Sequence, residues 1–94
     1  MNPISTEALA AARARLDAAE AMREDILLRH IANGVVIESR TVCIEESVQI
    51  APGATILAGT ILRGNTVIGA GCVIGPNTLI EDSTVDEGTT VNAS

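Results

Sequence analysis

The chain has 94 residues, of which 19% are charged, and its 12 acidic and 6 basic side chains give a formal charge of −6. This length suits a single domain. The acidic balance argues against a nucleic-acid backbone or an anionic membrane as partner, because no basic patch is present to neutralise phosphates. The sequence also contains no Phe, Trp or Tyr on which a nucleic-acid base could stack.

No apolar segment approaches the length needed to span a bilayer, and the N-terminal residues lack the long apolar core of a secretory signal. The two cysteines, Cys43 and Cys72, stand alone and lack metal-type spacing. We therefore expect both to be free thiols in a reducing, cytoplasmic compartment. Cys72 is expected to point inward, and Cys43 outward, in the repeat that follows the N-terminal helix.

Residues 4–32 are expected to form one long helix, because the segment is rich in Ala, Leu, Arg, Glu and Met. Its start can be capped at Asn2, Ser5 or Thr6, and Gly34 supplies the left-handed residue that commonly ends a helix. A thin apolar stripe on one side consists of Leu9, Ala12, Leu16, Ala19, Met22 and Ile26. Half of this stripe is alanine, so the helix is expected to be marginal alone and to pack against something else.

From Val35 onward the pattern changes to a repeat of six residues. The aliphatic residues at every sixth position are Ile44, Ile50, Ile56, Leu62, Ile68, Ile74 and Ile80. The small or β-branched residues four places after each, expected to fill a second inward position of the repeat, are Val48, Ala54, Thr60, Thr66, Cys72, Thr78 and Thr84. Pairs of turn-forming or small residues, such as Pro52-Gly53, lie between the two sets. A six-residue unit holds one short strand and one tight corner and must stack on its neighbours, which is typical of a parallel β-helix built from hexapeptide repeats.

Three hexapeptides make one coil of a three-sided prism, so residues eighteen apart are expected to lie in vertical columns. The expected columns are Ile44–Leu62–Ile80, Ile50–Ile68–Val85 and Ile56–Ile74–Val91. Val85 follows Ile80 by five residues instead of six, so one corner is a residue shorter, and Ile37 precedes Ile44 by seven. We expect about three coils in residues 35–94, preceded by a linker-type helical region, residues 1–34, that covers their upper end.

The lower end of such a stack exposes unpaired strand edges and apolar side chains of the last coil. Exposed strand edges invite association, and solenoids usually carry a polar cap at each end. We therefore expect the chain either to form an oligomer or to be part of a longer protein.

Two blocks of sequence carry a family resemblance. The first runs from Arg29 to Val35 (RHIANGV) and resumes at Ile50 (IAPGATI), and the second begins at Gly64 (GNTVIGAGCVIGPN). Together they resemble the middle of the bifunctional bacterial family N-acetylglucosamine-1-phosphate uridyltransferase/glucosamine-1-phosphate acetyltransferase, from about Ala18 to Ser94. The resemblance implies a long linker helix followed by a left-handed β-helix that trimerises. The left hand comes from the resemblance alone, since parallel crossovers are normally right-handed.

That family makes UDP-N-acetylglucosamine for cell-wall polymers and uses Mg²⁺ and acetyl-CoA. Its uridyltransferase site lies in a Gly-rich domain before the linker helix and includes a metal-binding asparagine, whereas its acetyltransferase site lies in later coils. No residue here matches either site: Gly34 is the first glycine, and Asn2 comes too early to be the asparagine. We therefore predict no catalytic, cofactor-binding or metal-binding residue, and no cofactor, for this chain itself.

Several residues that are candidates for chemistry favour structural roles. His30, the one histidine, is expected to interact with the last carbonyls of the helix instead of acting as a general base. Gly69-Ala70-Gly71 is expected to be a repeat corner and not a phosphate loop, because no helix or lysine follows it. The carboxylates expected at solvated outward or corner positions are Glu45, Glu46, Glu81, Asp82, Asp86 and Glu87. The arginines expected on a solvated helix face, with contact to another domain as the alternative, are Arg13, Arg15, Arg23 and Arg29.

Three hypotheses on function remain open. The preferred one is a trimerising scaffold segment of a uridyltransferase/acetyltransferase-like protein, without activity of its own. The second is a small stand-alone hexapeptide acyltransferase that uses acetyl-CoA at subunit clefts; the position of His30 outside the coils counts against it. The third is an interaction module that assembles with a separate nucleotidyltransferase chain.

Overall fold

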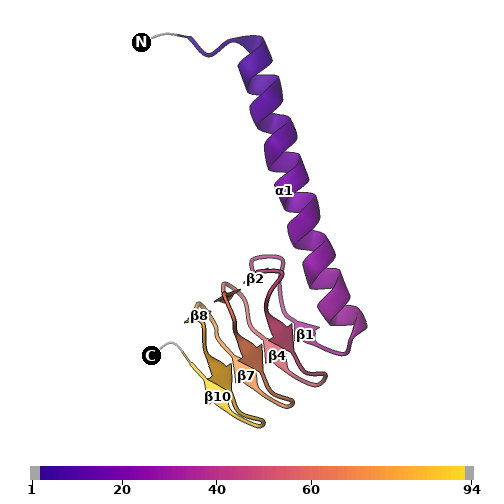
Figure 1. Ribbon diagram of the computed structural model, residues 1–94, viewed down its shortest axis with the longest axis vertical. Helices are drawn as coiled ribbons and strands as arrows, with labels where there is room; N and C mark the ends of the chain where they lie inside the picture. The colour runs from indigo at the N-terminus through magenta and orange to yellow at the C-terminus, as the bar shows by residue number, and fades with distance from the viewer. Residues whose placement is uncertain (1–2, 93–94) are drawn as a thin grey trace.

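The computed structural model describes residues 3–92 and contains one helix followed by a β-helix of short parallel strands (Figure 1). The helix, α1, spans Thr6–Ala32. The strands are β1 (Val36–Ile37), β2 (Cys43–Ile44), β3 (Gln49–Ile50), β4 (Thr55–Ile56), β5 (Ile61–Arg63), β6 (Val67–Ile68), β7 (Val73–Ile74), β8 (Leu79–Glu81), β9 (Thr84–Val85) and β10 (Thr90–Val91). The cap considered at Asn2 lies outside the described residues.

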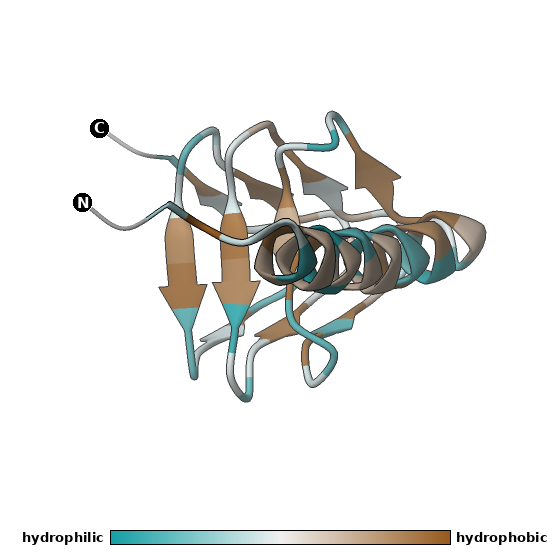
Figure 2. Ribbon diagram, turned by 90° about the horizontal axis from the view of Figure 1, so that it is seen from above, coloured by the Kyte–Doolittle hydropathy of each residue, from teal (hydrophilic) through white to brown (hydrophobic). Residues whose placement is uncertain are grey.

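The strands form three parallel sheets, one for each side of a three-sided prism. Sheet A has the order β1-β4-β7-β10, sheet B the order β2-β5-β8, and sheet C the order β3-β6-β9. Each strand therefore pairs with the strand three places later in the chain, which is one coil further along the prism axis. Figure 1 shows β1, β4, β7 and β10 side by side, and in Figure 2 the apolar strands alternate with more polar corners. The prediction of about three hexapeptide coils behind one helix is confirmed.

The strand register confirms the predicted columns. The paired residues are Ile44↔Leu62↔Ile80, Ile50↔Ile68↔Val85, and Ile56↔Ile74↔Val91. All seven aliphatic side chains at the sixth positions are buried, with exposed fractions of 8% or less. Ile37 pairs with Ile56 and so extends the third column upward. The interior of the prism is therefore a stack of branched aliphatics that bury one another from coil to coil.

The second inward position is filled by small side chains, as predicted, with one exception. Val48, Ala54, Thr60, Thr66 and Cys72 are buried and Thr78 is half-buried. Thr84 is exposed and pairs with the outward Val67, because the shortened corner after Ile80 shifts its strand by one residue. The buried threonine hydroxyls are satisfied: Thr66 Oγ1 donates to the Arg63 carbonyl at 2.7 Å, and Thr60 Oγ1 donates to the Ile74 carbonyl at 3.5 Å.

Helix α1 begins and ends at residues that the sequence suggests. Ser5 is the N-cap, and its side chain accepts a hydrogen bond from the Ala8 N–H at 3.1 Å. At the other end Asn33 N–H donates to the Arg29 carbonyl at 3.1 Å, and Gly34 follows with φ +91°. The helix begins two residues later than the expected 4–32, because Ser5, the second of the three candidate positions, is the cap.

Helix α1 crosses the first coil only near its C-terminal end. Leu27 is the one buried side chain of the helix, and Ile26 is half-buried against the core. The helix contacts β1 and β2, and Glu24 forms an ion pair with Arg40 of the first coil at 2.9 Å. The rest of the helix projects past the prism (Figure 1). The expectation that a helix covers the upper end is thus met by its last two turns, while Leu16 in the apolar stripe is 60% exposed.

Gly34 belongs to both parts of the fold. Its carbonyl accepts a hydrogen bond from Gly53 N–H at 2.9 Å, which places it on the corner column that continues through Gly53 and Gly71. A Cβ on Gly34 would approach Pro52 Cβ to 3.2 Å, in a left-handed conformation that side chains rarely adopt. The residue that ends the helix is therefore also the first step of the β-helix.

Candidate functional site

The six carboxylates singled out in the coils lie on the outside, as predicted. Glu45, Glu46, Glu81, Asp82, Asp86 and Glu87 are all exposed. Among residues 3–92 no group of three His, Cys, Asp or Glu side chains converges in a way that could hold a metal ion. Two of these carboxylates have an unpredicted role in the corners.

Glu45 and Asp82 bind the backbone of the coil between them. Glu45 Oε1 accepts a hydrogen bond from Gly64 N–H at 2.7 Å, and Asp82 Oδ1 accepts one from Asn65 N–H at 2.8 Å. Asp82 has φ +48°, which Asp tolerates better than most residues. Both side chains therefore satisfy amides at a tight corner, where the strand ladder supplies no acceptor.

His30 lies at the C-terminal end of α1 and is half-buried. Burial lowers the pKa of its imidazole below the ordinary value of 6.5, and the charge of Arg29 lowers it further. The expected attraction between a charged imidazole and the helix carbonyls is therefore outweighed by desolvation. None of the side-chain hydrogen bonds among residues 3–92 involves this imidazole, so it lacks the orienting partner that a general base needs.

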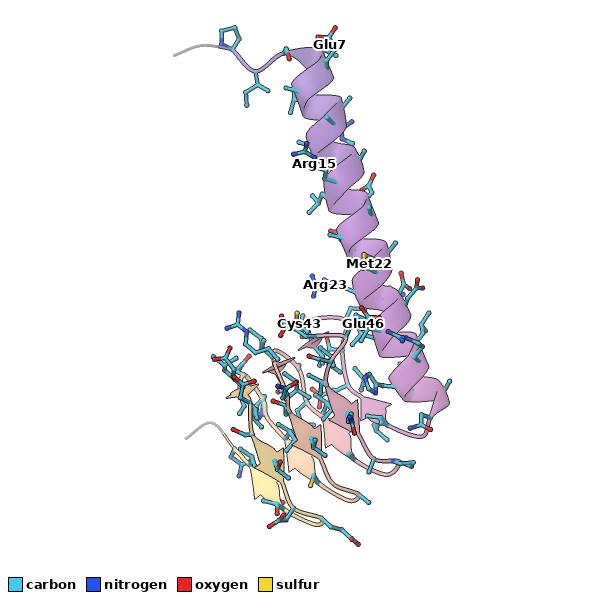
Figure 3. The ribbon with its side chains drawn as sticks, in the orientation of Figure 1. Glu7, Arg15, Met22, Arg23, Cys43 and Glu46 are labelled. Carbon is cyan, nitrogen blue, oxygen red and sulfur yellow. The ribbon has the colours of Figure 1, made fainter. Side chains whose placement is uncertain are left out.

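The junction of α1 with the first coil holds a surface depression of about 540 Å³ along one side of the helix. Met22, Ile26 and Leu28 supply its apolar lining, and Glu46 reaches it from the first coil. Figure 3 shows Met22 on the helix and Glu46 on the coil below it. The four helix arginines are exposed, as predicted. This depression is open to solvent.

The remaining sequence candidates are structural. Gly69-Ala70-Gly71 forms a corner between sheets C and A, as predicted. Cys43 is a half-buried free thiol on the outside of β2, and Cys72 is a buried free thiol whose Sγ lies 3.0 Å from the Asp86 carbonyl oxygen. Within residues 3–92, no helix combines the length and hydropathy that a membrane span requires.

The outside of the prism has three edges, named here after the sheets that they join. Edge AB consists of residues 38–42, 57–60 and 75–78, edge BC of residues 45–48, 64–66 and 82–83, and edge CA of residues 51–54, 69–72 and 86–89. The six-residue period alone makes these edges equivalent, because it assigns positions as inward or outward but does not distinguish the three sides. The structure shows that they differ in charge and in apolar exposure.

Comparison with known families gives a match to a repeat family. Residues 47–82, which include β3 to β8, match a family described as bacterial transferase hexapeptide (six repeats). Neither the curated proteins nor the solved structures yield a match to this chain. With the columns and parallel sheets described above, the match shows that the chain has the hexapeptide-repeat fold of acyltransferase-like proteins.

Proposed function

We propose that this chain is a trimerising scaffold segment of a protein related to the bifunctional uridyltransferase/acetyltransferases, and that it carries no catalytic residue of its own. The observation that supports the scaffold role is the use of the chemically capable groups. Glu45 and Asp82 accept hydrogen bonds from backbone amides at a corner. His30 lies outside the coils, and its pKa is lowered. The left hand of the coils is part of the same proposal.

The described residues do not fit the cofactors of the related family. Mg²⁺ needs several converging oxygen ligands, whereas Glu45 and Asp82 lie on opposite sides of the Gly64-Asn65 corner and each accepts a hydrogen bond from a backbone amide. The phosphates of acetyl-CoA need cations, and the two arginines of the coils each lie beside a carboxylate. Arg40 pairs with Glu24 at 2.9 Å, and Arg63 lies 3.5 Å from Glu81.

A second candidate function is favoured by the exposure of α1. Leu9 and Leu16 are 49% and 60% exposed on the projecting part of the helix, where Arg15 also extends into solvent (Figure 3). A helix with an exposed apolar stripe is a common docking element. In this proposal the β-helix is an interaction module, and α1 contacts a separate nucleotidyltransferase chain.

Light scattering and an acetyl-transfer assay on the purified chain test the scaffold proposal. We expect a mass close to three times the 9.7 kDa of one chain, and no transfer from acetyl-CoA to glucosamine-1-phosphate. A monomer at every concentration would remove the trimer. Acetyl transfer by the purified chain would replace the scaffold proposal with the stand-alone acyltransferase. This conclusion would hold whether a His30→Gln variant kept the activity or lost it.

A further inference from the structure

The carboxylates of the β-helix are distributed unevenly over its three edges. Residues 35–92 contain seven carboxylates and two arginines, so the prism is strongly acidic. The carboxylates at or beside edge BC are Glu45, Glu46, Glu81 and Asp82, those on edge CA are Asp86 and Glu87, and edge AB has only Glu38. Glu38 lies in the first coil, two residues from Arg40. In the second and third coils, edge AB carries no charge at all.

Of the four large apolar side chains that are exposed on the described β-helix, two lie beside this edge. Cys43, Ile61 and Leu79 are in register, one above another, on the first position of the sheet B strands, directly after the corner. Ile61 is 39% exposed and Leu79 is 57% exposed. On the other side of the corner lies the half-buried Leu57, at the end of β4. Large apolar side chains therefore flank edge AB on both sides.

Edge CA is also uncharged in its upper two corners, and one large exposed apolar side chain, Val36, lies beside it. Those corners are Ala51-Pro52-Gly53 and Gly69-Ala70-Gly71, which carry small side chains, and the third corner contains Asp86 and Glu87. A close contact along the whole of edge CA would bring these carboxylates near other acidic chains. Edge BC has the same disadvantage in its first and third corners.

We propose that edge AB is the surface through which copies of this chain contact one another. This inference rests on the proposed trimer and identifies the part of the prism that forms it. Association along edge AB removes Ile61 and Leu79 from water and keeps six of the seven carboxylates away from the contact, where like charges would repel across a short distance. The Leu57 side of one copy meets the Ile61 side of the next. Because these two sides differ, the contact is heterologous, as a closed ring of three copies requires.

Three equivalent positions of the middle coil allow a matched experiment. Ile61, Val67 and Val73 are the first residues of β5, β6 and β7, are six residues apart, and point outward beside edges AB, BC and CA, respectively. Ile61 and Val67 are equally exposed, at 39%. The variants Ile61→Glu, Val67→Glu and Val73→Glu therefore place the same charge on each edge at the same height of the prism.

We expect Ile61→Glu to raise the dissociation constant of the oligomer by about 30-fold or more, since a charge at the centre of an apolar contact acts like the loss of a main anchor. Val67→Glu and Val73→Glu should leave the mass measured by light scattering unchanged. Circular dichroism of each variant checks that the coils remain folded. The milder Ile61→Thr should weaken the oligomer in the same direction while keeping a β-branched residue on the strand.

The outcomes separate this inference from the proposed function. If the unmodified chain is a monomer at all concentrations, the trimer and edge AB fail together. If the unmodified chain is a trimer and Ile61→Glu remains a trimer while Val67→Glu or Val73→Glu dissociates, edge AB is wrong and the scaffold proposal stands. If all three variants dissociate equally, the contact is not confined to one edge, and the inference is also overturned.

Discussion

The β-helix and α1 differ in where their apolar side chains find partners. In the β-helix each inward aliphatic lies against the equivalent residue of the next coil, and the seven sixth-position side chains are at most 8% exposed. In α1 one side chain, Leu27, is buried, whereas Leu16 and Met22 are 60% and 62% exposed. In the repeat, each inward side chain packs against the equivalent side chain eighteen residues later. The burial of a helix side chain depends instead on whether another element lies against it.

This difference predicts two levels of local stability in one chain. The prism should resist opening because its strands are held by ladders on both sides and by a continuous core. The projecting turns of α1 have intrahelical hydrogen bonds and little tertiary packing, and such helices are marginal in water. The following predictions test that contrast.

The largest effect is expected from a cavity in the middle of the core. Ile56 is fully buried between Ile37 and Ile74. Ile56→Ala should lower the free energy of unfolding by about 2–5 kcal/mol, measured by urea denaturation. Leu16→Ala is the control in the exposed part of α1 and should change it by less than about 0.5 kcal/mol. Equal losses from the two variants would contradict the contrast between the regions.

A close approach of two coils should produce the next effect. A Cβ on Gly69 would lie 2.6 Å from Glu87 N and 2.9 Å from its Cα, and these are backbone atoms of the following coil. Gly69→Ala should cost roughly 3 kcal/mol, since overpacking against backbone forces the coils apart. At Gly88, φ is +73° and an added Cβ meets nothing, so Gly88→Ala should cost about 1 kcal/mol. A larger loss from Gly88→Ala would show that backbone conformation matters more than coil spacing.

The attachment of α1 to the first coil should depend on Leu27. Leu27→Ala is expected to cost about 2 kcal/mol, and the loss should be local. Hydrogen exchange should accelerate in the last turns of α1, while the amides of β4 to β8 keep their protection. Leu28→Ala is the control, because Leu28 is the neighbouring leucine and is 53% exposed. Faster exchange throughout the β-helix would mean that α1 stabilises the whole prism.

The smallest effect concerns the pH dependence of the junction. Because the pKa of His30 is lowered in the folded chain, the unfolded chain binds the proton more tightly. The contribution of neutral His30 to stability is therefore complete above pH 6.5 and is lost as the pH falls below that value towards the lowered pKa. His30→Gln should flatten the fall in melting temperature between pH 7 and pH 5 relative to the unmodified chain. A steeper fall in the variant would mean that the charged imidazole stabilises the fold.

The columns of the prism were predictable because side-chain alternation and the six-residue period leave little freedom. Even the shortened corner before Val85 follows from counting residues between aliphatics, and the structure pairs Val85 with Ile68. The outward turn of Thr84 is a consequence of the same shift, but the fixed spacing of four residues placed it wrongly inside. A local rule applied across an irregular corner fails by one residue, which in a strand means the opposite face.

The surface features were harder to predict because they depend on contacts between coils. The hydrogen bonds of Glu45 to Gly64 and of Asp82 to Asn65 join residues 19 and 17 positions apart, so no local motif predicts them. Helical periodicity places Leu9 on the same side as Leu27, eighteen residues later. Periodicity does not predict how far along this side the contact between α1 and the prism extends. In the structure, Leu27 is 8% exposed and Leu9 is 49% exposed.

The double role of Gly34 has a mechanical consequence. With 27 residues, α1 is about 40 Å long and acts as a lever whose fulcrum is the first corner of the prism. A tilt of about 10° at Gly34 would sweep the far tip through about 7 Å. The position of a domain attached to that tip would depend mainly on the packing of Leu27 and on the Glu24–Arg40 ion pair. These two contacts are small compared with the length of the helix whose direction they fix.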